Sequence, residues 1–99
     1  MARAVIWADS AIAALISAAE YIASDSPSYA AALVAGASKT AQSLGTLSSR
    51  GRLVPEYRNP NIREVFVGSY RLIYHVSHDR IEIVVFIHGA RDFSASTGE

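Results

Sequence analysis

The fold is decided by residues 62–88, which read IREVFVGSYRLIYHVSHDRIEIVVFIH. β-branched and aromatic residues, which favour strands, are concentrated in three runs at 62–67, 70–76 and 81–87. Only Gly68-Ser69 separates the first two runs, and only residues 77–80 separate the second and third, so both connections are short enough for hairpins. The stretch therefore predicts an antiparallel meander of three strands.

The lengths of these turns predict which side chains meet. A two-residue first turn places Glu64 diagonally next to Arg71, and a four-residue second turn places Arg71 opposite Phe86. On that register Glu64, Arg71 and His88 share one face of the sheet. A carboxylate, a guanidinium and an imidazole could there perform acid–base chemistry with stabilisation of developing charge. The alternative is that Arg71 only pairs with Glu64 beside a surface histidine.

The first half of the chain predicts a short strand at 3–7 and then two helices. Apolar residues recur at helical spacing in a first stripe made of Ile12, Leu15, Ile16, Ala19 and Ile22. Either Asp25 or Ser26 can cap a new helix whose first position suits Pro27, and a second stripe follows at Tyr29, Leu33, Ala37, Thr40 and Leu44. The connector at 47–61 is rich in Ser, Gly, Pro and Arg and contains an irregular strand at 52–56.

The elements together predict one α+β domain over residues 1–93, ordered β-α-α-β-β-β. A helical hairpin packs on one face of a small, mostly antiparallel sheet, and the first strand joins the sheet edge. Residues 94–99 have no apolar pattern and are expected to form a flexible tail.

Composition narrows the function classes. The 99 residues carry nine basic and nine acidic side chains and no cysteine, which excludes disulfides and thiolate metal sites. The three histidines lack metal-ligand spacing and no glycine-rich nucleotide motif occurs, so neither a metal nor a cofactor is predicted. No membrane span or signal peptide is predicted, and the expected location is the cytoplasm. Apolar residues make up 51% of this short chain, which leaves apolar surface for a protein partner.

Five segments resemble one known family. They are VIWADSA at 5–11, YIASDSP at 21–27, GRLVPEYRNPNIRE at 51–64, GSYRLIY at 68–74 and HGARDF at 88–93. Together they are similar to the RelE/ParE superfamily of bacterial toxins from type II toxin–antitoxin modules, whose fold agrees with the predicted element order. The resemblance implies growth arrest by the toxin and neutralisation by a cognate antitoxin.

The resemblance implies two alternative mechanisms. RelE-like members cut mRNA on the ribosome, whereas ParE-like members inhibit DNA gyrase without nuclease chemistry. In the ribonuclease reading Arg71 corresponds to the family's charge-stabilising arginine, Glu56 is the nearest match to its general base, and His88 would protonate the leaving oxygen. The predicted sheet register nominates Glu64 in place of Glu56, and both remain candidates.

Three features favour the gyrase inhibitor. Phe93 stands where many of the ribonucleases have a tyrosine, Lys39 is the only lysine, and the chain is neutral although RNA binding on the ribosome favours basic proteins. Under that hypothesis Arg63, Arg71, His88 and Arg91 form a target-binding patch on the surface, or these charges simply hold the sheet together.

The antitoxin's C-terminal segment is expected to fold as it binds across the helical hairpin and the open sheet edge, giving a toxin–antitoxin hetero-oligomer.

Overall fold

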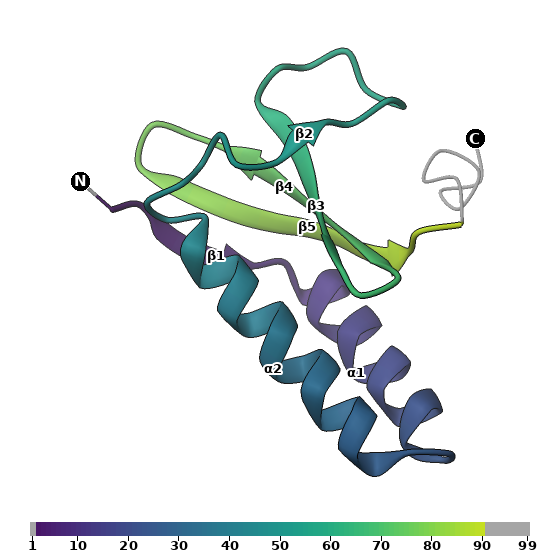
Figure 1. Cartoon of the computed structure of the whole chain (residues 1–99). Helices are drawn as coiled ribbons and strands as arrows, with labels where there is room; N and C mark the ends of the chain where they lie inside the picture. The colour runs from purple at the N-terminus through teal and green to yellow at the C-terminus, as the bar shows by residue number, and fades with distance from the viewer. Residues whose placement is uncertain (1, 91–99) are drawn as a thin grey trace.

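The computed structural model describes residues 2–90, which form two helices packed on one face of a five-stranded sheet (Figure 1). In chain order the elements are β1 (Ala4–Trp7), α1 (Asp9–Ala23), α2 (Pro27–Ser43), β2 (Arg52–Leu53), β3 (Ile62–Val67), β4 (Tyr70–Val76) and β5 (Arg80–His88). The strand order is β1-β5-β4-β3-β2, with β1 parallel to β5 and all other neighbours antiparallel. The α+β class, the helical hairpin, the meander and the edge position of the first strand are confirmed. The expected tail at 94–99 lies outside the described residues.

The two helices begin in different ways. At the start of α2 the Ser26 hydroxyl accepts a hydrogen bond from the Tyr29 amide at 3.2 Å, and Pro27 occupies the first helical position, as predicted. Helix α1 starts without a side-chain cap, and Asp9 instead places its carboxylate in the positively polarised first turn. Within residues 2–90 neither helix has the length and apolar content to cross a membrane.

The core lies between the helices and the sheet. Alanines let the helices approach closely, and the sheet contributes larger side chains such as Leu72, Tyr74 and Ile83, all fully buried. The stripe predicted for α1 is wrong at Ile12 and Ile16, which are 41% and 51% exposed. Leu15 and Ile22 pack against the core as predicted, and the rest of the core-facing side of α1 is made of Ala11, Ala14 and Ala18. On α2 Leu33, Ala37 and Leu44 are buried as predicted, whereas Tyr29 is 59% exposed.

The first hairpin has the predicted register throughout, whereas the second keeps the predicted register only from the Val76–Ile81 pair to the Tyr74–Ile83 pair. Phe66 pairs with Arg71 across β3 and β4, as expected from the two-residue turn, in which Gly68 has a φ of 58°. Between β4 and β5 the pairing shifts by one residue, so Arg71 faces Ile87 instead of Phe86. The shift is a β-bulge that adds one residue to β5, and such a slip moves every later side chain to the other face. His88 is therefore on the opposite face from Arg71.

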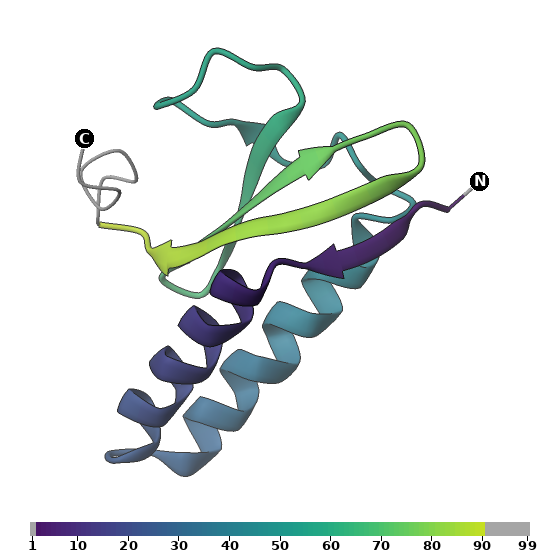
Figure 2. The ribbon, with the colours of Figure 1, turned by 180° about the vertical axis from the view of Figure 1, so that it is seen from behind.

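The connector crosses the end of the sheet and then covers its open face. Residues 54–61 stand on the side of the sheet away from the helices (Figures 1 and 2). Val54 is buried against Ile73 on that face. At the crossing, a Cβ on Gly51 would lie 2.6 Å from the Glu64 carbonyl oxygen and 2.6 Å from the Tyr74 hydroxyl, so only glycine fits there. This close path brings Glu56 over the middle of the sheet.

Candidate functional site

The candidate site is a chain of alternating charges on the open face of the sheet. Arg71 donates from Nη1 and Nη2 to the two carboxylate oxygens of Glu56 at 2.9 and 2.8 Å, and from Nε to Glu64 Oε1 at 2.6 Å. Arg52 Nε donates to the other Glu64 oxygen, Oε2, at 2.6 Å. The order Glu56–Arg71–Glu64–Arg52 balances two positive and two negative charges. We call these four residues the ion network.

Three strands and the connector position the ion network. Glu64 on β3 is diagonal to Arg71 on β4, as the first-hairpin register predicted, and Arg52 on β2 pairs directly with Glu64. Glu56 arrives from the loop that Val54 anchors to the sheet. Both glutamates proposed from the sequence therefore bind the same guanidinium.

The middle of the ion network is buried. Arg71 is 5% exposed and Glu64 is 1% exposed, whereas the side chain of Glu56 is 13% exposed and that of Arg52 is 59% exposed. The bidentate hydrogen bonds from Glu56, together with Glu64, raise the pKa of Arg71 above its ordinary value even though burial opposes its charge. Arg71 is thus permanently charged and held by two carboxylates, the arrangement of a structural ion pair.

The surface above the ion network is formed by an aromatic ring and a guanidinium. Phe66 on β3 is 51% exposed, and the Arg52 guanidinium carbon lies 5.5 Å from the centre of its ring. Arg52 and Phe66 are therefore a solvent-exposed cation–π pair on the same face of the sheet as Arg71.

His88 takes no part in the ion network. It pairs with Tyr70 on the helix-facing side, where the two rings meet edge to face with centroids 5.3 Å apart, and Tyr70 stacks on Phe86 at 5.0 Å. His88 Nδ1 accepts a hydrogen bond from the Ala90 amide at 3.2 Å. The predicted convergence of Glu64, Arg71 and His88 is therefore wrong for the histidine, because the bulge in β5 reverses its side.

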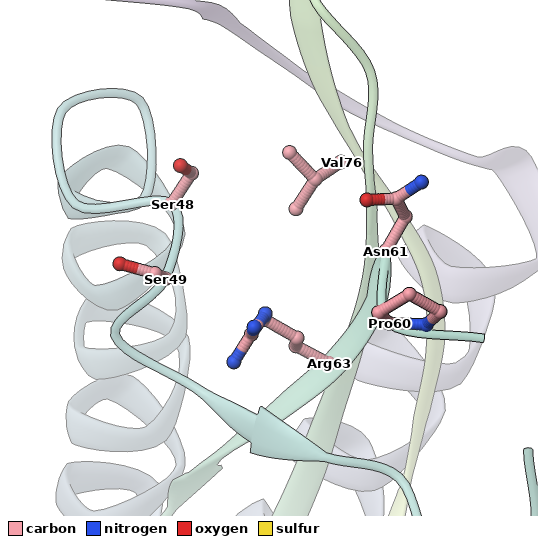
Figure 3. Close-up of a pocket in the computed structure, with 6 residues that line it drawn as sticks. All are labelled: Ser48, Ser49, Pro60, Asn61, Arg63 and Val76. Atoms are coloured by element: carbon pink, nitrogen blue, oxygen red, sulfur yellow. The ribbon is translucent and has the colours of Figure 1, made fainter. Parts of the chain in front are cut away.

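The predicted target-binding patch is not assembled in the structure. Arg63 lies opposite Tyr74 near the start of β3, on the helix-facing side, and points into a pocket beside the connector (Figure 3). His88 is at the other end of that face, and Arg71 is buried on the opposite face. Arg91 lies outside the described residues.

Tyr74 links the sheet to the connector. Its hydroxyl donates to the Ser48 carbonyl at 2.8 Å and accepts from the Gly51 amide at 2.9 Å. Burial raises the pKa of Tyr74, while the Gly51 hydrogen bond and the nearby positive charges of Arg63 and Arg50 act in the opposite direction. These two buried hydrogen bonds anchor the connector to the sheet.

Large apolar side chains remain exposed on the helical hairpin. They are Ile12, Ile16 and Tyr21 on α1 and Tyr29 and Val34 on α2. Each strand at a sheet edge adds one more, Ile6 on β1 and Leu53 on β2. The apolar surface expected from the composition is thus present on the hairpin and at both edges of the sheet.

Residues 2–90 contain no cluster of three or more histidine and acidic side chains placed to bind a metal ion. Their distinctive features are a buried ion network and an apolar helical surface. They define a small α+β protein with a surface suited to binding another protein.

Comparison with known proteins agrees with this class. Residues 5–93 match the profile described as ParE toxin of type II toxin-antitoxin system, parDE, and the chain belongs to that family. A solved structure titled "Chromosomal ParDE TA system from P. aeruginosa" has a similar fold, with a TM-score of 0.70 and 18% sequence identity. The similarity covers 87% of this chain and 95% of that one. No curated protein sequence matches significantly.

Proposed function

We propose that this toxin arrests growth by binding DNA gyrase, and that a cognate antitoxin neutralises it by covering the helical hairpin. The burial of Arg71 is the observation that supports gyrase binding over RNA cleavage. An arginine that stabilises charge on a scissile phosphate must reach that phosphate with its N–H groups. Here its Nε and both Nη atoms donate to carboxylates, and a phosphate would have to displace Glu56 from a bidentate pair.

The position of His88 supports the same proposal. A general acid must lie within about 3 Å of the oxygen that it protonates, directly or through one water. His88 and Arg71 are on opposite faces of β4 and β5, so one phosphodiester cannot contact both side chains in this arrangement. Protein binding needs no such convergence.

Purified components test the gyrase proposal. The toxin is added to gyrase, ATP and plasmid DNA, and the products are separated to detect cleaved DNA and loss of supercoiling. The same preparation is added to a translation extract with a defined mRNA. We expect gyrase inhibition without mRNA cleavage. Cleavage of the mRNA with normal gyrase activity would support the RelE-like alternative, in which Arg71 and His88 act on RNA after a rearrangement.

The antitoxin surface is proposed from the exposed apolar side chains of the hairpin. Burial of these groups, Ile12 and Ile16 among them, would supply the main driving force for a segment that folds on binding. Hydrogen exchange of the toxin with and without antitoxin tests this surface. We expect slower exchange in α1 and α2, and unchanged protection in both helices would contradict the proposed interface.

A further inference from the structure

A positively charged side chain, Arg63, lies on the helix-facing side of the sheet, opposite the face that carries the ion network. Arg63 donates from Nη1 to the Gly51 carbonyl at 2.9 Å. The ion pairs within residues 2–90 involve only Arg52 and Arg71, so Arg63 faces no carboxylate partner there. A half-buried guanidinium without a counter-charge attracts anions.

Arg63 points into a pocket of about 160 Å³ (Figure 3). The connector carries Ser48 and Ser49 on one side of this pocket, and Pro60, Asn61 and Val76 form the other. Within residues 2–90 neither the Ser49 hydroxyl nor the Asn61 side-chain amide has a hydrogen-bond partner. Both groups can rotate and donate into the pocket.

Two further arginines keep this end of the molecule positive. Arg3 donates from Nη1 to the Ser48 hydroxyl at 2.9 Å, and Arg50 donates to the Ser43 hydroxyl at 2.7 Å. Neither has an ion-pair partner among the described residues. The carboxylates of Glu56 and Glu64 are held by the ion network on the opposite face of the sheet. Asp79 lines the neighbouring pocket beside Arg3 and offsets part of this charge, which leaves Arg50 and Arg63 as the positive charges next to the connector.

We propose that this pocket binds a phosphate group, with Arg63 as the anchor and Ser49 and Asn61 as additional donors. The Gly51 and Tyr74 hydrogen bonds fix the connector, so the pocket is largely formed before the ligand arrives. Donors on separate sides of the pocket suit a tetrahedral anion with several acceptor oxygens better than a planar carboxylate. The phosphate can be free or part of a nucleotide.

The test is a titration of the isotopically labelled full chain, followed by NMR at constant ionic strength. The probes are inorganic phosphate, adenosine 5′-monophosphate and, as the planar anion, acetate. We expect saturable shifts in the amides of residues 48–51 and 61–63 with phosphate. Tighter binding of the nucleotide would identify a phosphate monoester as the ligand, weaker binding would identify free phosphate, and equal binding would show that the site recognises the phosphate group alone.

Variants separate this site from general charge attraction. Arg63→Gln is expected to weaken phosphate binding about tenfold or more, because the anchoring charge is lost. Arg58→Gln removes the same charge from an exposed position of the connector and should leave the affinity unchanged. Arg63→Lys keeps the positive charge and should retain saturable phosphate binding. If both Arg63→Lys and Arg63→Gln lose binding, the loss reflects a disturbed connector and not the missing charge.

Three results would overturn the proposal: shifts that increase linearly with phosphate, equal binding of acetate, or full affinity in Arg63→Gln. None of these measurements involves growth arrest or gyrase. The phosphate site and the proposed function can therefore fail independently.

Discussion

Replacement of Arg71 by methionine tests whether this arginine is a structural residue. The substitution keeps an unbranched side chain but leaves Glu64, which is 1% exposed, without its buried partner. Removing one member of a buried ion pair costs about 3–5 kcal/mol. Because Glu64 Oε2 keeps its hydrogen bond from the exposed Arg52, we expect a cost at the lower end of this range, about 3 kcal/mol. For a domain of this size, 3 kcal/mol lowers the melting temperature by about 12–24 °C. A large part of the total stability depends on this one side chain.

The assay is urea unfolding of four proteins: the unchanged chain, Arg71→Met, Glu64→Gln and the double variant. Glu64→Gln removes the charge but keeps the shape, and Arg71 retains its bidentate bonds to Glu56. We expect the double variant to be less destabilised than the sum of the single changes by about 1–3 kcal/mol, the range of direct coupling. An Arg71→Met chain with unchanged stability but no toxicity would refute the structural role and favour a catalytic arginine.

Three further predictions concern other parts of the fold. Gly51→Ala should destabilise the chain by about 1–3 kcal/mol because its Cβ would meet backbone and the Tyr74 hydroxyl at 2.6 Å. Gly36 lies inside α2, and the Cβ of Gly36→Ala would make ordinary contact with Val67 Cγ1 on β3 at 3.6 Å, so this change should stabilise the chain by about 0.5–1 kcal/mol. Equal effects of the two glycine substitutions in thermal unfolding would contradict this contrast. Tyr74→Phe should cost about 1–3 kcal/mol at pH 7. Burial raises the pKa of Tyr74 above its ordinary 10.0, so the unchanged chain should lose stability as the pH rises past 10. The difference in unfolding free energy between the unchanged chain and Tyr74→Phe should therefore shrink above pH 10, whereas a constant difference would exclude Tyr74 titration. Ile16→Lys changes a side chain that is 51% exposed and should leave stability within about 0.5 kcal/mol, but weaken antitoxin binding; unaltered binding by calorimetry would exclude Ile16 from that interface.

The sequence predicts the fold well because its signals are local. Hairpin turns of two and four residues, strand runs rich in β-branched residues and a Ser-Pro helix start each specify structure within a few residues. The Glu64–Arg71 contact follows from such a turn, and the structure confirms it. Glu56 could be named as a site residue only from the family resemblance. Its contact with Arg71 depends on the path of a loop over the sheet, which the sequence does not specify.

The side on which His88 lies was predicted wrongly for a physical reason. A single extra residue in β5 reverses every later side chain, and the run at 81–87 contains no glycine or proline to mark a bulge. Val84 and Val85 are both partly buried against the cluster of Val54 and Ile73, so the bulge serves packing on the open face. Only the three-dimensional arrangement of that face reveals it.

The predicted core-facing stripe of α1 was partly wrong because the sequence contains two overlapping apolar faces on this helix. Counting large side chains favoured Ile12 and Ile16, but the alanines Ala11 and Ala18 lie against the sheet, where close approach matters more than side-chain size. Arg52 was missed because its partner Glu64 is twelve positions away and pairs through a strand of only two residues.

Under the proposed function this toxin binds a protein target and does not cut RNA with Arg71. Incorporation of labelled thymidine and methionine, measured in the first minutes after the chain is induced without its antitoxin, tests this directly. We expect DNA synthesis to fall first while translation continues. An early fall in methionine incorporation, with cleaved mRNA and normal thymidine incorporation, would contradict it.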